Sequence, residues 1–182
     1  MPLIMGILAQ GVGAAPVGAG AYDLLETQVL GTAAASVTFT GLGSYTNYKH
    51  LQLRYTVRGT RSATGSFIRM RFNNDTGTNY ADHRLVGTGG SVISGNNTTV
   101  DDIYLGAMPA GNDTTDGFHA GVLDVLDFSS ASKNTTIRQL AGQVTDTDQV
   151  GLYSGVYIDT SAITDLTLIE NYGDNFAVAS WR

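Results

Sequence analysis

The stretch His50 to Arg58, HLQLRYTVR, decides the fold because its apolar and polar side chains alternate with a period of two. The apolar set is Leu51, Leu53, Tyr55 and Val57. Successive side chains of a β-strand point to opposite faces of the sheet, so this set lies on one face. The stretch therefore predicts a strand that is buried on one face and solvated on the other.

The stretch Ser66 to Phe72, SFIRMRF, repeats this alternation. Ile68, Met70 and Phe72 share one parity, and Phe67, Arg69 and Arg71 share the other. The arginines of the two stretches could face outward from one sheet on neighbouring strands, and such a stack of like charges needs a carboxylate partner. We therefore expect six side chains to be buried between two sheets: Leu53, Tyr55, Val57, Ile68, Met70 and Phe72.

Further strands are predicted along the rest of the chain, and no long window has a period of 3.6 residues. They cover residues 22–30, 35–42, 80–87, 101–108, 118–128, 135–144, 149–158, 165–170 and 176–182. Segments rich in Gly, Asn, Asp and Ser separate them and predict turns, the longest being residues 87–99. The pattern predicts an all-β protein, an antiparallel β-sandwich with the connectivity of a jelly roll.

The first 21 residues differ from the rest because they carry no charged side chain. They lack the basic region of a secretory signal, and their apolar run is too short to span a bilayer. We predict two parts, an extended N-terminal arm over 1–21 and a single sandwich domain over 22–182. The expected anchors of the arm are Leu3, Ile4, Met5, Ile7 and Leu8. They pack either on the domain itself or on a partner chain, and we favour the partner chain.

Charge is scarce and unevenly placed. Charged residues make up 14% of the chain, the net charge is −6, and nonspecific nucleic-acid binding is not expected. Six of the eight arginines lie between Arg54 and Arg84, whereas residues 101–174 hold eleven Asp and one Glu. Either these regions neutralise each other within one chain, or a basic patch meets acidic side chains of a neighbouring copy. The candidate arginines for such an interface are Arg54, Arg58, Arg69 and Arg71.

No motif predicts catalysis, a cofactor or a metal. The tripeptide Asp75-Thr76-Gly77 also carries the catalytic carboxylate of aspartic proteases, but it occurs once and lies in an Asn/Asp/Gly cluster typical of a turn. There is no cysteine, no G-x-S-x-G and no phosphate-binding loop. Loop aspartates offer oxygen ligands for Ca²⁺ without EF-hand spacing. These are Asp75, Asp113, Asp116, Asp146 and Asp148.

The segment from Gly6 to Val92 resembles structural proteins of tailed bacteriophages. The resemblance rests on GILA at the start, then SVTF, YKHLQLR and RFNNDTGTNYADHRL. It implies a virion component without catalytic residues, either a capsid decoration (cement) protein or the distal domain of a tail fibre. It also implies a homotrimer, with the major capsid protein or another virion protein as partner.

Two roles are compatible with this resemblance. A fibre needs a shaft or adaptor, and the similar segment begins within ten residues of Met1, so we favour capsid decoration. A tail component that binds a host-surface glycan is the alternative, because jelly rolls bind sugars through exposed aromatic side chains. The candidates are Tyr45, Tyr48, Tyr80, Tyr104, Tyr153, Tyr157, Tyr172 and Trp181. They serve equally well as core residues.

Overall fold

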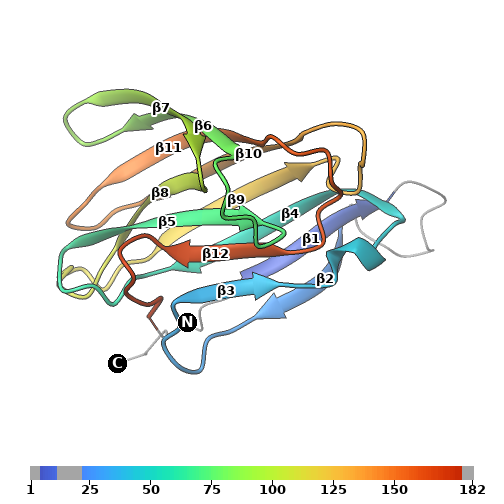
Figure 1. Ribbon diagram of the computed structural model, residues 1–182. Helices are drawn as coiled ribbons and strands as arrows, with labels where there is room; N and C mark the ends of the chain where they lie inside the picture. The colour runs from blue at the N-terminus through green and yellow to red at the C-terminus, as the bar shows by residue number, and fades with distance from the viewer. Residues whose placement is uncertain (1–4, 12–21, 178–182) are drawn as a thin grey trace.

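The computed structural model describes residues 5–11 and 22–177 (Figure 1). Within this part of the chain the elements are twelve strands and one short 3₁₀ helix, Leu42–Ser44. The strands are β1 Met5–Gly11, β2 Asp23–Gln28, β3 Ser36–Phe39, β4 Tyr48–Val57, β5 Gly65–Phe72, β6 Tyr80–Gly87, β7 Val92–Val100, β8 Ile103–Pro109, β9 His119–Leu126, β10 Thr135–Gln143, β11 Gln149–Tyr157 and β12 Leu166–Glu170.

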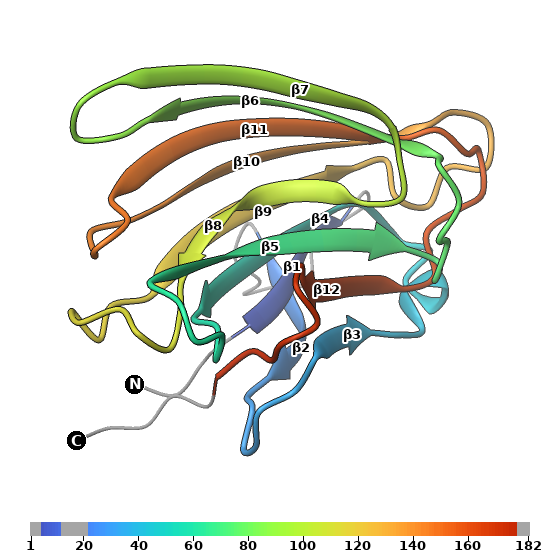
Figure 2. The same cartoon turned by 60° about the vertical axis from the view of Figure 1, so that its left-hand side comes forward.

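These strands form two sheets that pack face to face. The larger has the order β2-β1-β4-β9-β10-β11-β6-β7, and the smaller has the order β3-β12-β5-β8. The two views together show the smaller sheet on one side of the larger one, with β6 and β7 at an edge (Figures 1 and 2). All the strand pairs are antiparallel. The prediction of an all-β antiparallel sandwich is confirmed, and jelly-roll connectivity stays a prediction.

The alternation in β4 and β5 positions the core as predicted. The two strands are not neighbours in one sheet, as the arginine pattern suggested, but belong to opposite sheets, and their inward residues join a single apolar cluster. All six expected side chains are buried: Leu53, Tyr55, Val57, Ile68, Met70 and Phe72. Arg54 of β4 and Arg69 and Arg71 of β5 lie at the intervening positions of the sequence, and their side chains point to the outer faces of the two sheets.

Part of the predicted arm lies inside the larger sheet. The backbone of Met5–Gly11 pairs with β2 on one side and with β4 on the other. Such pairing satisfies the backbone groups of β4 that an edge position would leave open. From the sequence, this segment is expected to be an extended arm that docks on the domain or on a partner chain, because nothing in its local pattern indicates which strand it will pair with. Leu3, Ile4 and residues 12–21 lie outside the described residues.

The edge strand β7 was expected to be a turn. Residues 87–99 contain Gly, Ser and Asn, which are depleted in strands, so local preference predicts a loop. In the structure Val92–Val100 pairs with β6 and contributes almost no buried side chain. Tertiary pairing therefore overrides the local preference. Of the last predicted strand, Phe176 forms isolated bridges with Ala34 and Gly59, and residues 178–182 lie outside the described part.

A histidine is buried in the core. His119 of β9 is fully enclosed, and its ring centroid lies 5.9 Å from that of Tyr55. Neither ring nitrogen has a hydrogen-bond partner among the described residues. Burial disfavours the charged imidazolium and lowers the pKa of His119 to about 4.

Replacing Leu53 with Ala should destabilise the protein by about 2–5 kcal/mol, because it leaves a cavity between two packed sheets. Chemical denaturation monitored by circular dichroism measures the change. Val144→Ala is the matched control: Val144 is 88% exposed, so its loss should change stability by less than about 0.5 kcal/mol. Equal effects of both substitutions would contradict the assigned core.

The buried His119 should make the fold sensitive to acid. Its pKa is about 4 in the folded state and 6.5 ordinarily, so the unfolded chain binds the proton more readily between these values. Stability should therefore fall as the pH decreases from 6.5 to 4, by up to about 3 kcal/mol from this residue. In His119→Leu this part of the pH dependence should disappear, whereas the exposed His83→Gln should retain it. If the denaturation midpoint fell by the same amount between pH 6.5 and pH 4 in His119→Leu and in the parent protein, His119 would not be the source of this acid sensitivity.

Candidate contact surface

The four arginines of the predicted charged interface occupy different surroundings. Arg58 is largely buried, donates hydrogen bonds to the carbonyl oxygens of Asp113 (2.8 Å) and Gly117 (3.1 Å), and lies 3.8 Å from the Asp113 carboxylate. This contact ties β4 to the loop before β9. The Arg58 guanidinium therefore stabilises a contact within its own chain.

Arg69 and Arg71 also have acidic partners in the same chain. Arg69 pairs with Asp102 at 3.0 Å, and Arg71 pairs with Asp101 at 2.5 Å. Arg54 donates to Gln52 at 2.9 Å, and no acidic partner lies within 4 Å of it in the described ranges. Three of the four arginines are thus neutralised within the chain, which is one of the two possibilities that the charge distribution left open.

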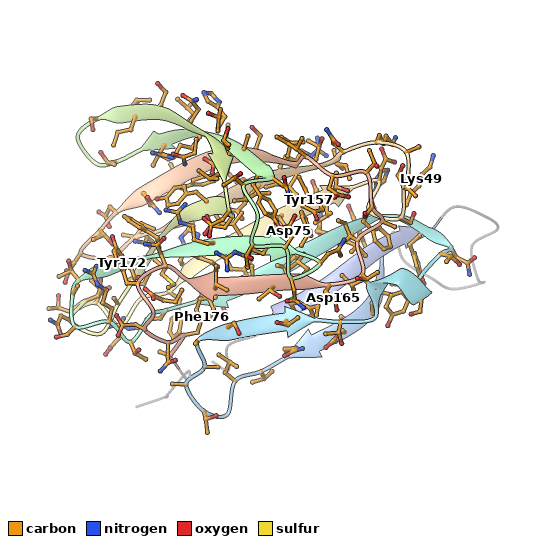
Figure 3. The ribbon with its side chains drawn as sticks, viewed as in Figure 1. Lys49, Asp75, Tyr157, Asp165, Tyr172 and Phe176 are labelled. Carbon is orange, nitrogen blue, oxygen red and sulfur yellow. The ribbon has the colours of Figure 1, made fainter. Side chains whose placement is uncertain are left out.

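The D-T-G stretch forms a turn. The Asp75 carboxylate accepts hydrogen bonds from the Gly77 amide (2.7 Å), the Asn79 side chain (2.8 Å) and the Tyr157 hydroxyl (3.0 Å). Figure 3 shows Asp75 and Tyr157 next to each other. These hydrogen bonds, that of Asn79 first, lower the pKa of Asp75. The carboxylate is therefore occupied in fastening the β5–β6 turn to β11.

Asp113 and Asp146 fasten two neighbouring loops to each other. Asp113 accepts from Thr115 and from the Asp146 amide (3.0 Å), and Asp146 accepts from Thr114 (2.8 Å). Burial by itself raises the pKa of Asp113, but the hydrogen bonds from Thr115 and Asp146 outweigh it, and the pKa lies below its usual value. Over residues 5–11 and 22–177, no group of three or more acidic or histidine side chains is arranged to hold a metal ion.

The candidate sugar-binding tyrosines occupy several places in the fold. Tyr80, Tyr153 and Tyr157 are buried, and Tyr45 packs edge-on against Tyr48 with ring centroids 6.3 Å apart. Tyr104 and Tyr172 both pack against Phe67, with ring centroids 5.5 and 5.6 Å from it, and the Arg61 guanidinium lies 3.7 Å from the Tyr172 ring centroid. Trp181 lies outside the described residues. The glycan-binding alternative stays a prediction.

An exposed apolar row crosses the outer face of the larger sheet. Four side chains pair directly across β9, β10, β11 and β6, in the order Val122, Leu140, Leu152 and Leu85. They are 42%, 56%, 56% and 48% exposed, respectively. They line an open trough of about 700 Å³ together with polar neighbours. Large apolar side chains that adjoin one another on a surface mark a contact with another molecule.

Two parallel rows flank the apolar row. On one side lie Asp124, Arg138, Ser154 and His83, in the same strand order. Arg138 donates to Asp124 at 3.0 Å, which orients both side chains over the sheet. On the other side lie Ala120, Gly142, Val150 and Gly87. The surface of these three rows is called the outer face below.

Two inward glycines of the larger sheet lie beneath tyrosine rings. A Cβ atom at Gly121 of β9 would come within 2.5 Å of the Tyr55 ring, and one at Gly151 of β11 within 2.5 Å of the Tyr153 ring. The tyrosine rings thus occupy the space that inner side chains at these positions would need. Leu140 and Leu152 lie at the opposite, outward parity of β10 and β11.

These strands were predicted from the sequence, but their outer face was not. A signal for this face is present in the sequence, because β10 and β11 carry apolar residues at both parities, a pattern typical of strands covered on both sides.

No family model and no curated protein matches this chain. Among the described residues, no helix has the length and apolar character needed to cross a membrane.

The Asp113 contacts generate a prediction on stability. Asp113→Asn should destabilise the fold by about 1–3 kcal/mol, because Arg58 loses its charge partner and the added amide N–H₂ faces donors. The exposed Asp116→Asn is the control and should be close to neutral. Because the folded-state pKa of Asp113 is below 3.8, its contribution is present above that pH and is lost on acidification through the lowered value. A loss of equal size in both variants at pH 7 would contradict this role.

Proposed function

We propose that this chain is a non-enzymatic structural protein of a tailed-bacteriophage virion. In this proposal it is a capsid decoration protein on the capsid surface that stabilises the head by bridging capsid subunits. The observation that supports an assembly role is the outer face, where Val122, Leu140, Leu152 and Leu85 form a continuous exposed apolar row. A surface of this kind gains free energy when a protein neighbour removes it from water.

The proposal of a tailed-phage virion rests on a different observation. Residues 6–92 carry the resemblance to tailed-phage structural proteins, and they include β4, β5 and β6 of the sandwich. Three of the four candidate arginines are neutralised within the chain. Apolar contacts are therefore expected to contribute more to the free energy of assembly than ion pairs. The major capsid protein or a second copy of the chain is the neighbour expected there.

The strand order supports the finer fold assignment, a jelly roll. The smaller sheet has the order β3-β12-β5-β8. In the larger sheet, which it faces, the hairpin β10–β11 lies between the pair β4-β9 and the pair β6-β7. Without that hairpin and without β1 and β2, two four-stranded sheets remain, and the chain alternates between them over β3, β4, β5 and β6. Two four-stranded sheets are the architecture of a jelly roll. The hairpin widens the face on which the apolar row lies.

The test uses virions of the phage that encodes this chain. A reconstruction of the particle should place the chain on the head, and particles made without its gene should lose that density and rupture at lower temperature. Adding the purified chain should restore both. Leu140→Glu should restore occupancy several-fold less well than the control Val29→Glu, which places the same charge after β2, at the other edge of the larger sheet. Absence from particles, or a location on the tail, would contradict the proposal.

A further inference from the structure

We propose that the occupant of the outer face is a second copy of this chain, related by a two-fold axis that runs along the strands between β10 and β11. This inference rests on the proposed assembly role and names its partner. It stands on the register of the sheet, which determines which side chains meet when two copies of this face are placed together. A contact of this type is isologous, so the face must complement itself.

The apolar row matches itself about this axis. The axis exchanges β10 with β11 and β9 with β6, because these strands lie symmetrically on its two sides. Leu140 then faces Leu152 of the second copy, and Val122 faces Leu85. Every member of the row is therefore covered by another apolar side chain.

The polar row also meets itself without opposing like charges. Asp124 faces His83 of the second copy, and Arg138 faces Ser154. The carboxylate thus lies opposite a histidine, which is a donor or a cation, and the guanidinium lies opposite a hydroxyl acceptor. If the axis instead ran across the strands, the polar row would cover the row of Ala120, Gly142 and Val150, and Asp124 and Arg138 would lack partners in the second copy. Charge complementarity therefore favours the axis along the strands.

The third row matches by size. Gly142 faces Val150 of the second copy, and Ala120 faces Gly87, so a small residue lies opposite each large one or opposite another small one. A valine side chain fits over a glycine without separating the sheets, which favours the spacing of about 10 Å between packed sheets.

The size of the face suits a weak dimer. The outer face covers four strands about 4.8 Å apart and three rows about 6.8 Å apart, which give roughly 400 Å² per copy. The same axis exchanges β4 with β7, and these two strands raise the covered area to roughly 600 Å² per copy. Specific protein interfaces bury about 800 Å² per partner, and weaker ones bury less.

The first experiment measures the mass of the full chain in solution, without particles, by light scattering and sedimentation at about 1–100 μM. We expect a dimer. Leu140→Glu should weaken the association roughly 10- to 100-fold, since it replaces a covered leucine with a carboxylate. Val29→Glu, equally acidic but placed after β2 at the other edge of the larger sheet, should remain dimeric. A monomer throughout, a trimer as the resemblance implies, or a dimer that Leu140→Glu leaves unchanged would overturn the inference.

The second experiment tests the axis, using the absence of cysteine from the chain. Val122→Cys and Leu85→Cys chains are mixed and treated with a short bismaleimide. The mixture should give several times more cross-linked dimer than either variant alone, because each site faces the other and identical sites lie about 14 Å apart along the face. Equal yields in all three samples would overturn the axis. If the chain is a monomer that still decorates particles, this inference is wrong and the proposed function stands. If the chain is a dimer that is absent from particles, the proposed function is wrong and the dimer stands.

Discussion

Burial of the apolar face of β4 is the constraint on which the rest of the structure depends. Leu53 pairs with Leu123 of β9, and both are fully buried between the sheets. A slip of one residue would turn every side chain of the strand to the opposite face. With this register set, the neighbouring pair Arg54 and Val122 must lie outside, and successive pairings carry the outward position to Leu140. The core and the outer face are two consequences of one alignment.

Charge in this protein serves mainly to hold its own loops and sheet edges. Arg58 fastens the loop that contains Asp113, and Arg69 joins β5 to the segment before β8 through Asp102. A chain in which only 14% of residues are charged has few such groups left for an interface after these contacts form. Association through an apolar face with a narrow polar border is consistent with that composition, because it needs geometric fit more than ion pairs.

Much of the fold could be predicted because β-strands show alternating apolar and polar residues in the sequence. β4, β5 and β6 were predicted within a residue or two, since β4 and β5 carry strongly patterned apolar faces and turn residues bound all three. β1 and β7 were not, for opposite physical reasons. β1 is apolar enough to be buried, but its partners β2 and β4 come later in the chain. β7 buries almost nothing and exists because β6 offers it an edge.

The sequence by itself determined the class of fold, the buried parity of β4 and β5, and the turn at Asp75, because alternation and turn chemistry act over a few neighbouring residues. Only the tertiary structure decided that β4 and β5 belong to opposite sheets, that three of the four candidate arginines have acidic partners in the same chain, and that Val122, Leu140, Leu152 and Leu85 form one row. These four residues are separated by up to 67 positions in sequence and become neighbours only through the order of strands in the sheet. Strand order arises from long-range pairing, which leaves no trace in the local pattern of any single strand.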